Sequence, residues 1–182
     1  ELDEHGSATG YQTRIEAFLD MVAHSAAPPQ TVAASHPSRI RYDMAGMRGK
    51  RLWIPQIHPY IPDLWAAMLR RHGYDTQALG AETQAHCDLG RSFCRGSECL
   101  PAALTIGRFI ENVNDSPRED VLIMPRANGP CRYGQYATLH SRILERVGLE
   151  KAQILSPTSA DGYAFFTPEI TRAAWKTACI GD

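Results

Sequence analysis

The sequence lacks a charge imbalance and a long hydrophobic run, and both absences exclude classes of partner. Its 19 basic and 20 acidic residues leave a formal net charge of −1. Such a balance gives no electrostatic footprint for nucleic acid or for an anionic membrane surface. No apolar segment approaches the roughly 18 consecutive residues that a membrane span needs, and no signal peptide is recognisable at the start. We therefore expect a cytoplasmic protein.

Several short functional motifs are missing as well. The sequence has no GxGxxG after a strand and no GxxxxGK[ST], so neither nicotinamide binding nor P-loop ATP hydrolysis has local support. It also lacks the nucleophile elbow of a Ser-His-Asp hydrolase. No close CxxC pair of the kind that announces zinc is present. The sequence has an odd number of cysteines, and their spacing is irregular: Cys87, Cys94, Cys99, Cys131 and Cys179. We therefore expect thiols or metal ligands rather than a disulfide scaffold.

The length of 182 residues suits one buried core with an appended arm. An apolar stripe at helical spacing runs from Tyr11 to Val22, and Thr9 is a candidate cap for that helix. Residues Ala26 to Pro37 carry three prolines among small and polar residues, which is typical of a linker. We predict a helical arm and linker over 1–37 and a domain over 38–182. Because the first residue is Glu1 rather than methionine, we expect a fragment of a larger multidomain protein.

Short apolar runs alternate with helical stripes through the rest of the chain. Strands are predicted near Leu52, Gln77, Leu122 and Ile154. Pro62 suits the first turn of the helix that follows the first strand, and Gly73 suits its C′ position. The alternation predicts a doubly wound, Rossmann-like α/β domain with a mostly parallel sheet. Helix and strand periods send these residues to the core: Ile54, Leu64, Met68, Leu104, Ile123, Leu139, Ile143 and Ile154.

The stretch from Met124 to Tyr136 is the first candidate site. It follows the apolar run Asp120 to Ile123 and leads into a helical stripe, so Cys131 is predicted at a strand-to-helix turn. In open α/β sheets ligands collect at this edge, and a helix start favours the thiolate form of cysteine. Gly129 and Gly134 bracket the turn and indicate that its backbone comes close to another group. The alternative, in which Cys131 is simply a small buried residue, stays open at this point.

A second cysteine stands at a helix start. Pro101 is predicted at the first helical position, and Cys99 lies just before it. If the strands are neighbours, both thiols open into one crevice at the carboxyl edge of the sheet. Cysteines from separate loops can hold an iron–sulfur cluster once the fold gathers them. We expect Arg132 to present its guanidinium there, where it can pair with Glu98 or meet an anionic ligand.

The residues around both cysteines resemble a known family. They are Gly96 to Ala102 with Leu104 to Gly107, and Gly129 to Tyr136; the opening Glu1 to His5 with Thr13 to Leu19 adds to them. These segments resemble the large activase-related proteins of the 2-hydroxyacyl-CoA dehydratase system, the CoA-substrate-specific enzyme activase family. The resemblance spans about Glu1 to Ser156.

The resemblance implies a dehydratase-like part of an ATP-dependent activase or reductase, although the fragment itself carries no ATPase motif. Its implied cofactor is a [4Fe-4S] cluster on Cys99 and Cys131, with Glu98 and Arg132 tuning the surroundings and Cys94 as a weaker third ligand. A third ligand can also come from outside the fragment, and we expect the cluster to be lost in an aerobic preparation. The implied partners are actin-like ATPase modules of the same chain, a dehydratase-type protein and a CoA thioester.

Two other hypotheses accompany this one. The first is a non-catalytic assembly or ligand-binding domain that keeps the α/β fold without a cluster. The second is a small-molecule enzyme that uses Cys131 as a nucleophile, for which His58 and His140 are the candidate bases.

Overall fold

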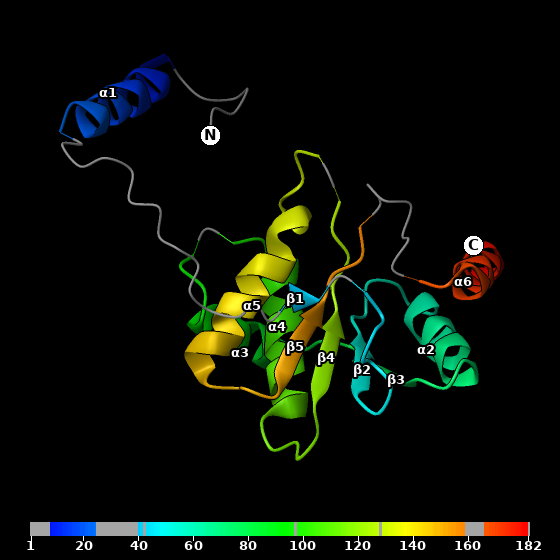
Figure 1. Ribbon diagram of the computed structural model, residues 1–182. Helices are drawn as coiled ribbons and strands as arrows, with labels where there is room; N and C mark the ends of the chain where they lie inside the picture. Colours follow the sequence, from blue (N-terminus) through cyan, green and yellow to red (C-terminus); the bar gives the residue numbers. More distant parts are fainter. Residues whose placement is uncertain are drawn as a thin grey trace. The chain divides into compact units, whose positions relative to one another are not determined.

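The computed structural model of the protein describes residues 8–24, 40–41, 43–96, 98–127, 129–158 and 166–181 (Figure 1). The chain divides into two compact units, Glu1–Pro37 and Ser38–Asp182. In the first unit, α1 spans Ala8–His24, so Thr9 lies inside the helix and not at its cap. The predicted stripe on α1 is exposed at Ile15, Phe18, Leu19 and Val22. The predicted linker, Ala26 to Pro37, lies outside the described residues.

The second unit is built on a five-stranded, all-parallel sheet with the order β1-β5-β4-β2-β3. The strands are β1 (Ile40–Arg41), β2 (Arg51–Ile54), β3 (Asp75–Ala78), β4 (Asp120–Ile123) and β5 (Ala152–Leu155). The predicted strands near Leu52, Gln77, Leu122 and Ile154 are confirmed. Strand β1 was not predicted, because only two of its residues pair and no apolar run marks them.

Helices cover both faces of the sheet. They are α2 (Ile61–Arg71), α3 (Gln84–Ser92), α4 (Leu100–Val113), α5 (Tyr136–Val147) and α6 (Pro168–Gly181), with the 3₁₀ turn η1 (Arg132–Gln135) before α5. Figure 1 shows α3, α4 and α5 on one side and α2 with α6 on the other. The strands alternate accordingly: Trp53 packs with α4 and α5, whereas Leu52 packs with α2 and α6. The doubly wound, Rossmann-like prediction is confirmed.

Most of the predicted core positions are buried or half-buried. Ile54, Ile123, Ile143 and Ile154 are buried, and Met68, Leu104 and Leu139 are half-buried. Leu64 was predicted wrongly and is 36% exposed. The reason is that the buried face of α2 centres on Pro62, Ala66 and Leu69, a position rotated from the predicted stripe. Gly73 follows α2 with a φ of 85°, as its predicted C′ role requires.

Helices α3 and α4 cross at glycines. A Cβ on Gly107 would collide with the carbonyl of His86, and one on Gly90 would collide with the carbonyl of Ala103. His86 of α3 also connects the two helices. Its Nδ1 accepts the N–H of Thr83 at 2.8 Å, and its Nε2 lies 2.8 Å from Oε2 of Glu111 on α4. This close contact fixes where α4, and therefore Cys99 at its start, lies on the sheet.

The order of the strands creates a switch point between β2 and β4. The chain leaves β2 for β3 through α2 on one face, and it reaches β4 through α3 and α4 on the other. In open α/β sheets, ligands bind outside the carboxyl ends of strands at such a point. Among the helices that the structure describes, none combines the length and the apolar character that crossing a bilayer requires.

Candidate functional site

Cys99 is the N-cap residue of α4. Its backbone is extended, with φ −65° and ψ 145°, and its carbonyl accepts the N–H of Ala102 at 3.0 Å. The helix begins at Leu100, so Pro101 occupies the second helical position and not the first, as had been predicted. The side chain of Cys99 is half-buried and packs against the core under α4 and α5. The thiol therefore lies at a helix start, as expected from the sequence.

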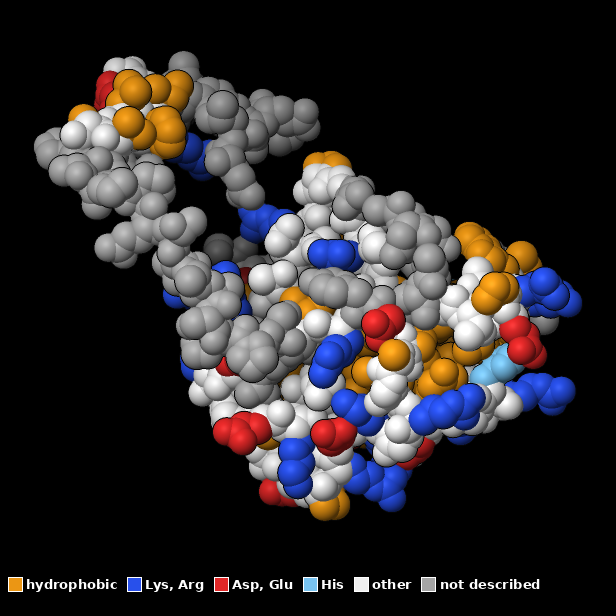
Figure 2. Space-filling view, viewed as in Figure 1, with side chains coloured by type: hydrophobic (Ala, Val, Ile, Leu, Met, Phe, Trp, Pro, Cys, Tyr) orange, Lys and Arg blue, Asp and Glu red, His pale blue; other side chains and the backbone are white. Residues whose placement is uncertain are grey.

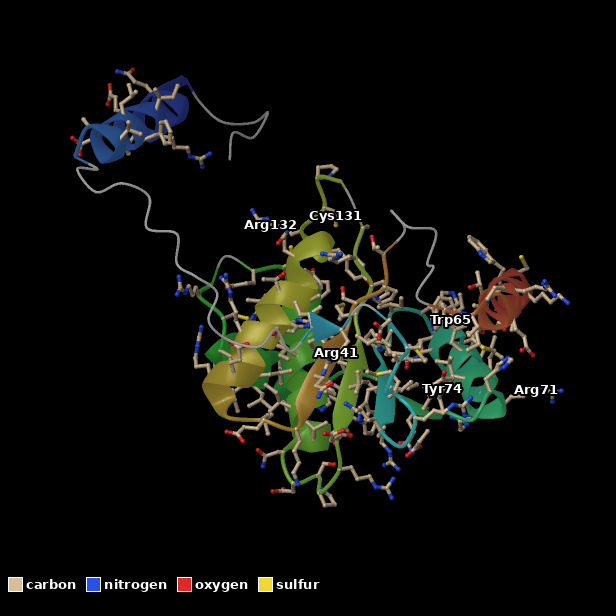
Figure 3. All side chains as sticks on the ribbon, in the orientation of Figure 1. Arg41, Trp65, Arg71, Tyr74, Cys131 and Arg132 are labelled. Atoms are coloured by element: carbon tan, nitrogen blue, oxygen red, sulfur yellow. The ribbon has the colours of Figure 1, made fainter. Side chains whose placement is uncertain are left out.

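Cys131 lies in the loop after β4, and the first part of this loop continues the parallel pairing of β4 with β5. The N–H of Arg126 donates to the carbonyl of Pro157 at 2.7 Å, and Arg126 forms a parallel bridge with Thr158. Cys131 then caps η1, its carbonyl accepting the N–H of Gly134 at 3.3 Å. Its side chain is exposed beyond the carboxyl ends of the strands (Figure 3). The strand-to-helix turn is confirmed, with a 3₁₀ turn between Cys131 and α5.

Tyr136, the first residue of α5, joins the two cysteine turns. Its ring is buried, and its hydroxyl hydrogen-bonds to the sulfur of Cys99. Burial raises the pKa of Tyr136 to about 12, helped by this hydrogen bond and by the negative charge that the Cys99 and Cys131 thiolates and Tyr133 place near it. Cys99 therefore acts on the hydroxyl through a hydrogen bond, and Cys131 is near enough to act on its pKa through charge alone. The meeting of the two sulfurs and joint cluster ligation stay predictions.

An aromatic row continues from the cysteines into the core. The ring centroids of Tyr133 and Tyr136 lie 5.2 Å apart, and those of Tyr136 and His140 lie 5.7 Å apart. His140 is fully buried, its Nε2–H donates to the carbonyl of Ala102 at 3.1 Å, and burial lowers its pKa to about 4. His140 is thus neutral at pH 7. Its ring packs against the ring of Tyr136.

Sequence reasoning missed the two tyrosines as site residues. Tyr136 was read only as the start of a helical stripe. The available signal was the spacing in Cys131-Arg132-Tyr133-Gly134-Gln135-Tyr136, which places two aromatic rings within five residues of the thiol. Residues three apart share a face once the chain turns helically, so the two rings meet edge to face.

The remaining predicted site residues lie around the two turns. The carboxylate of Glu98 accepts the N–H of Arg95 at 2.9 Å, and Arg132 is the exposed first residue of η1. Cys94 lies at the end of α3, where burial and the charge of Glu98 raise its pKa, with Arg146 opposing them. Burial thus favours the thiol form of Cys94. A Glu98–Arg132 ion pair stays a prediction.

The glycines of the Cys131 turn serve different purposes. Gly134 has no room for a side chain, because a Cβ there would press on the carbonyl of Ala127. Gly129 has open space around it, but its φ of 152° is a conformation that residues with side chains rarely adopt. The close approach predicted for this turn is therefore found at Gly134 alone.

The other candidate side chains have structural roles or lie elsewhere. Nδ1 of His58 accepts the N–H groups of Tyr60 at 3.2 Å and Ile61 at 3.4 Å, which caps α2 and engages one nitrogen of this candidate base. Cys87 is buried in α3, and Cys179 is exposed on α6. Within the described part of the chain, no group of three or more His, Cys, Asp or Glu side chains gathers as a metal site.

Comparisons with known proteins add no relative to this picture: no family model matches the chain, and neither curated proteins nor solved structures give a match.

Proposed function

We propose that the Ser38–Asp182 unit is a dehydratase-like domain in which Cys99 and Cys131 hold an iron–sulfur cluster. It would belong to a cytoplasmic, ATP-coupled activase or reductase that serves partners of the 2-hydroxyacyl-CoA dehydratase type. The observation that carries this proposal is that Cys99 and Cys131 each stand at the start of a helical segment at the carboxyl edge of one parallel sheet. The resemblance of the two cysteine motifs to that family supports it independently.

The chemistry and the exposure of the two cysteines support a role as iron–sulfur ligands. Thiolates are the ligands that iron–sulfur clusters require, and these two come from separate loops at one edge of a parallel sheet. Cys131 is exposed and Cys99 is half-buried, so a cluster on both would be open to further ligands from outside the described residues. Cys94 is the weaker third candidate, because its raised pKa favours the protonated thiol.

The surrounding side chains would tune such a site. A bound [4Fe-4S] cluster supplies one-electron transfer at low potential, and hydrogen bonds to its sulfur ligands raise that potential. The O–H of Tyr136 donates to the Cys99 sulfur, and its pKa of about 12 keeps it a donor throughout the neutral range. Arg132, the next residue in the chain, would add a positive charge beside an anionic cluster.

Anaerobic reconstitution of the full chain with ferrous iron and sulfide tests the proposal. We expect bound iron, bound sulfide and a cluster absorption spectrum in the wild type, with most of the iron lost in Cys99→Ser and in Cys131→Ser. Cys179→Ser is the matched control, because this cysteine is exposed on α6, and it should retain the wild-type content. Unchanged denaturation midpoints would show that lost ligation, not unfolding, explains the loss.

The opposite result also has a clear meaning. Equal iron content in the wild type and all three variants would remove the cluster proposal. The chain would then fit a non-catalytic assembly or ligand-binding domain with the same α/β fold. Tyr136→Phe adds a second measure: it should leave iron content unchanged while lowering the reduction potential.

A further inference from the structure

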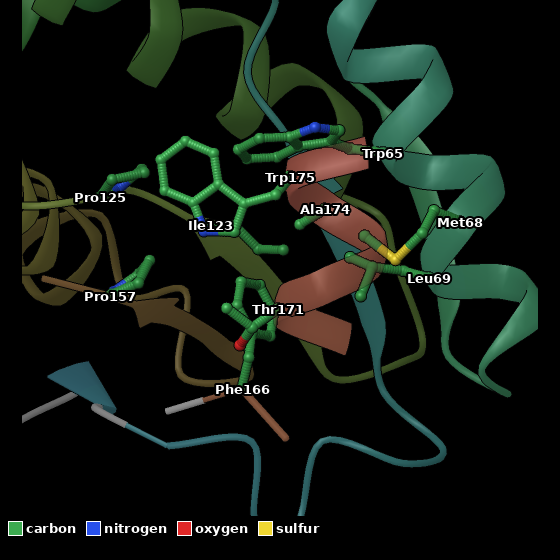
Figure 4. Close-up of a pocket in the computed structure, with 10 residues that line it drawn as sticks. All are labelled: Trp65, Met68, Leu69, Ile123, Pro125, Pro157, Phe166, Thr171, Ala174 and Trp175. Atoms are coloured by element: carbon green, nitrogen blue, oxygen red, sulfur yellow. The ribbon is translucent and has the colours of Figure 1, made fainter. Parts of the chain in front are cut away.

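Hollows of two kinds lie at opposite edges of the sheet. We call the first the apolar crevice and define it by Trp65 and Met68 of α2, Ile123 and Pro125 at the end of β4, and Phe166 and Trp175 on the α6 side (Figure 4). Figure 2 shows hydrophobic side chains gathered between α2 and the sheet. None of the described residues that line the apolar crevice carries a charge. The second hollow is polar and lies at the amino ends of the strands.

The polar hollow lies where two strands begin and two helices end. We define it by Asn114 and Arg118 after α4, Asp120 at the start of β4, and Gly148 and Lys151 between α5 and β5. Its volume is about 280 Å³. The C-terminal end of a helix carries a partial negative charge, so α4 and α5 both favour a cation in this place.

Asp120 brings a buried carboxylate to the polar hollow. It is 2% exposed, and its Oδ1 accepts the indole N–H of Trp53 at 2.7 Å. No described residue donates to its Oδ2 or forms an ion pair with it. The polar side-chain atoms that are both sealed from solvent and unpartnered in the described chain belong to Gln56, Trp65, His140 and Ser156. Oδ2 of Asp120 is not one of them, so it retains access to the hollow.

The alternation of β4 directs this side chain toward the hollow. Asp120 lies on the same face of β4 as Leu122, which packs in the core beneath α4 and α5. Val113 and Leu149 belong to that core and also line the hollow. The carboxylate of Asp120 and the hollow are therefore on the same side of the sheet.

The cations that line the hollow have acceptors elsewhere. Arg118 donates from Nη1 to Oδ2 of Asp75 at 3.1 Å, and Lys151 donates from Nζ to the carbonyl of Pro117 at 3.1 Å. Both side chains are exposed. A buried carboxylate is normally paired, because its desolvation costs more free energy than one hydrogen bond returns. Asp120 thus leaves a negatively charged acceptor open to a cation from outside the chain.

We propose that the polar hollow binds a small organic ammonium compound whose primary –NH₃⁺ group donates to Oδ2 of Asp120. Such a group carries several N–H donors, which suit a carboxylate together with the carbonyls at helix ends. A cavity of about 150 Å³ is known to hold benzene, so about 280 Å³ has room for the ammonium group and a short carbon chain.

A divalent metal suits the polar hollow less well. Calcium and magnesium need about six or more oxygen ligands, usually with several carboxylates among them. Within the described part of the chain, no group of three or more His, Cys, Asp or Glu side chains gathers as a metal site. The ammonium site is also independent of the proposed cluster, because the cysteine turns lie at the carboxyl edge of the sheet.

The indole N–H signals of the ¹⁵N-labelled full chain test the proposal, because Trp53 donates to the same carboxylate. The three tryptophans are assigned by single substitution to Phe. Propylammonium chloride should shift the Trp53 signal saturably and leave Trp65 and Trp175 in place. Tetramethylammonium, which has the same charge but no N–H group, should bind at least about tenfold more weakly. Magnesium chloride at equal ionic strength should not move the Trp53 signal.

Variants of the full chain identify the carboxylate. Asp120→Asn should abolish the saturable shift. Glu150→Gln is the matched control, because Glu150 also lines the hollow but is exposed, and it should change the affinity by no more than about threefold. Lys151→Ala removes a nearby positive charge and should tighten binding roughly two- to threefold.

The probe comparison uses the wild type alone, so it decides even if Asp120→Asn does not fold. The proposal is overturned if propylammonium leaves the Trp53 signal in place, or if tetramethylammonium or magnesium binds as well. It is also overturned if Asp120→Asn, with an unchanged denaturation midpoint, keeps the response. A Trp53 signal that moves as far in Lys151→Ala without a probe would overturn it too, because Lys151 would then be the partner of Asp120.

Discussion

The two faces of the sheet differ in how tightly they are closed. The cysteine face, covered by α3, α4 and α5, has a glycine-mediated helix crossing and a fully buried histidine. The crevice face, covered by α2 and α6, retains a hollow and an indole N–H without a partner among the described residues. The comparison teaches that the two faces of one sheet can be packed differently: close helix packing fixes side-chain positions on one face, and looser packing leaves a hollow on the other.

Acid should destabilise the protein through the cysteine face. The pKa of His140 falls from its ordinary value of 6.5 to about 4 in the folded protein, so the unfolded chain takes up its proton first. The stability that the neutral His140 provides is present above pH 6.5 and is lost as the pH falls from 6.5 to 4. Over this range the free energy of unfolding should fall by about 3 kcal/mol. Urea denaturation across this range measures the loss.

A pair of histidine variants isolates that effect. His140→Leu should flatten the dependence between pH 6.5 and 4, whereas His72→Gln at the end of α2 should keep it. An unchanged slope in His140→Leu would show that other groups govern acid stability.

The helix crossing on the cysteine face should not tolerate a methyl group. Gly107→Ala forces a Cβ against the carbonyl of His86, and we expect it to lower the free energy of unfolding by about 2 to 3 kcal/mol. Without that contact the substitution would favour the helix by roughly 0.5 to 1 kcal/mol. Chemical denaturation therefore distinguishes the two cases by sign, and a stabilised variant would contradict the close crossing.

The buried Trp53 and the half-buried Trp65 provide a test across the two faces. Trp53→Phe removes the donor that Asp120 accepts at 2.7 Å and leaves a buried carboxylate without it. Trp65→Phe removes an N–H that has no partner among the described residues. Because the change in side-chain size is the same, we expect Trp53→Phe to cost about 2 kcal/mol more than Trp65→Phe. Equal losses of stability in thermal or urea denaturation would mean that the hydrogen bond from Trp53 to Asp120 does not stabilise the fold.

Added bulk should be accepted on the crevice face. Ala174→Leu fills part of the lining, so we expect the free energy of unfolding to rise by about 0.5 to 1 kcal/mol. Ala137→Leu adds the same atoms to a fully buried position of α5 and should instead cost about 1 to 3 kcal/mol. If both variants were destabilised alike, the two faces would be equally well packed.

The parts of the fold that local patterns encode were predictable. Strands β2, β4 and β5 follow short apolar runs, and Gly73 marks the end of α2 because its positive φ suits glycine. Which residues of a helix are buried was less predictable. Leu64 fits the apolar spacing of α2 but is exposed, because the face that packs against the sheet centres on other residues.

The candidate sites were predictable only in part. The turns carrying Cys99 and Cys131 were foreseen, since proline, glycine and strand ends mark them locally. Tyr136 as their common neighbour was not, because its role depends on how α4 and α5 meet. The hollow between α2 and α6 could not be foreseen, because it forms only when Phe166 and Trp175 return to α2 from about a hundred residues away in the sequence.

The meeting of the two thiols is the central claim, and covalent cross-linking tests it most directly. A short bifunctional thiol reagent is added to the reduced full chain, and the proteolytic peptides are identified by mass spectrometry. The structure predicts an intramolecular link between the peptides of Cys99 and Cys131, lost in either serine variant and kept in Cys179→Ser. Separate single modification of Cys99 and Cys131, with no linked peptide, would contradict a shared site.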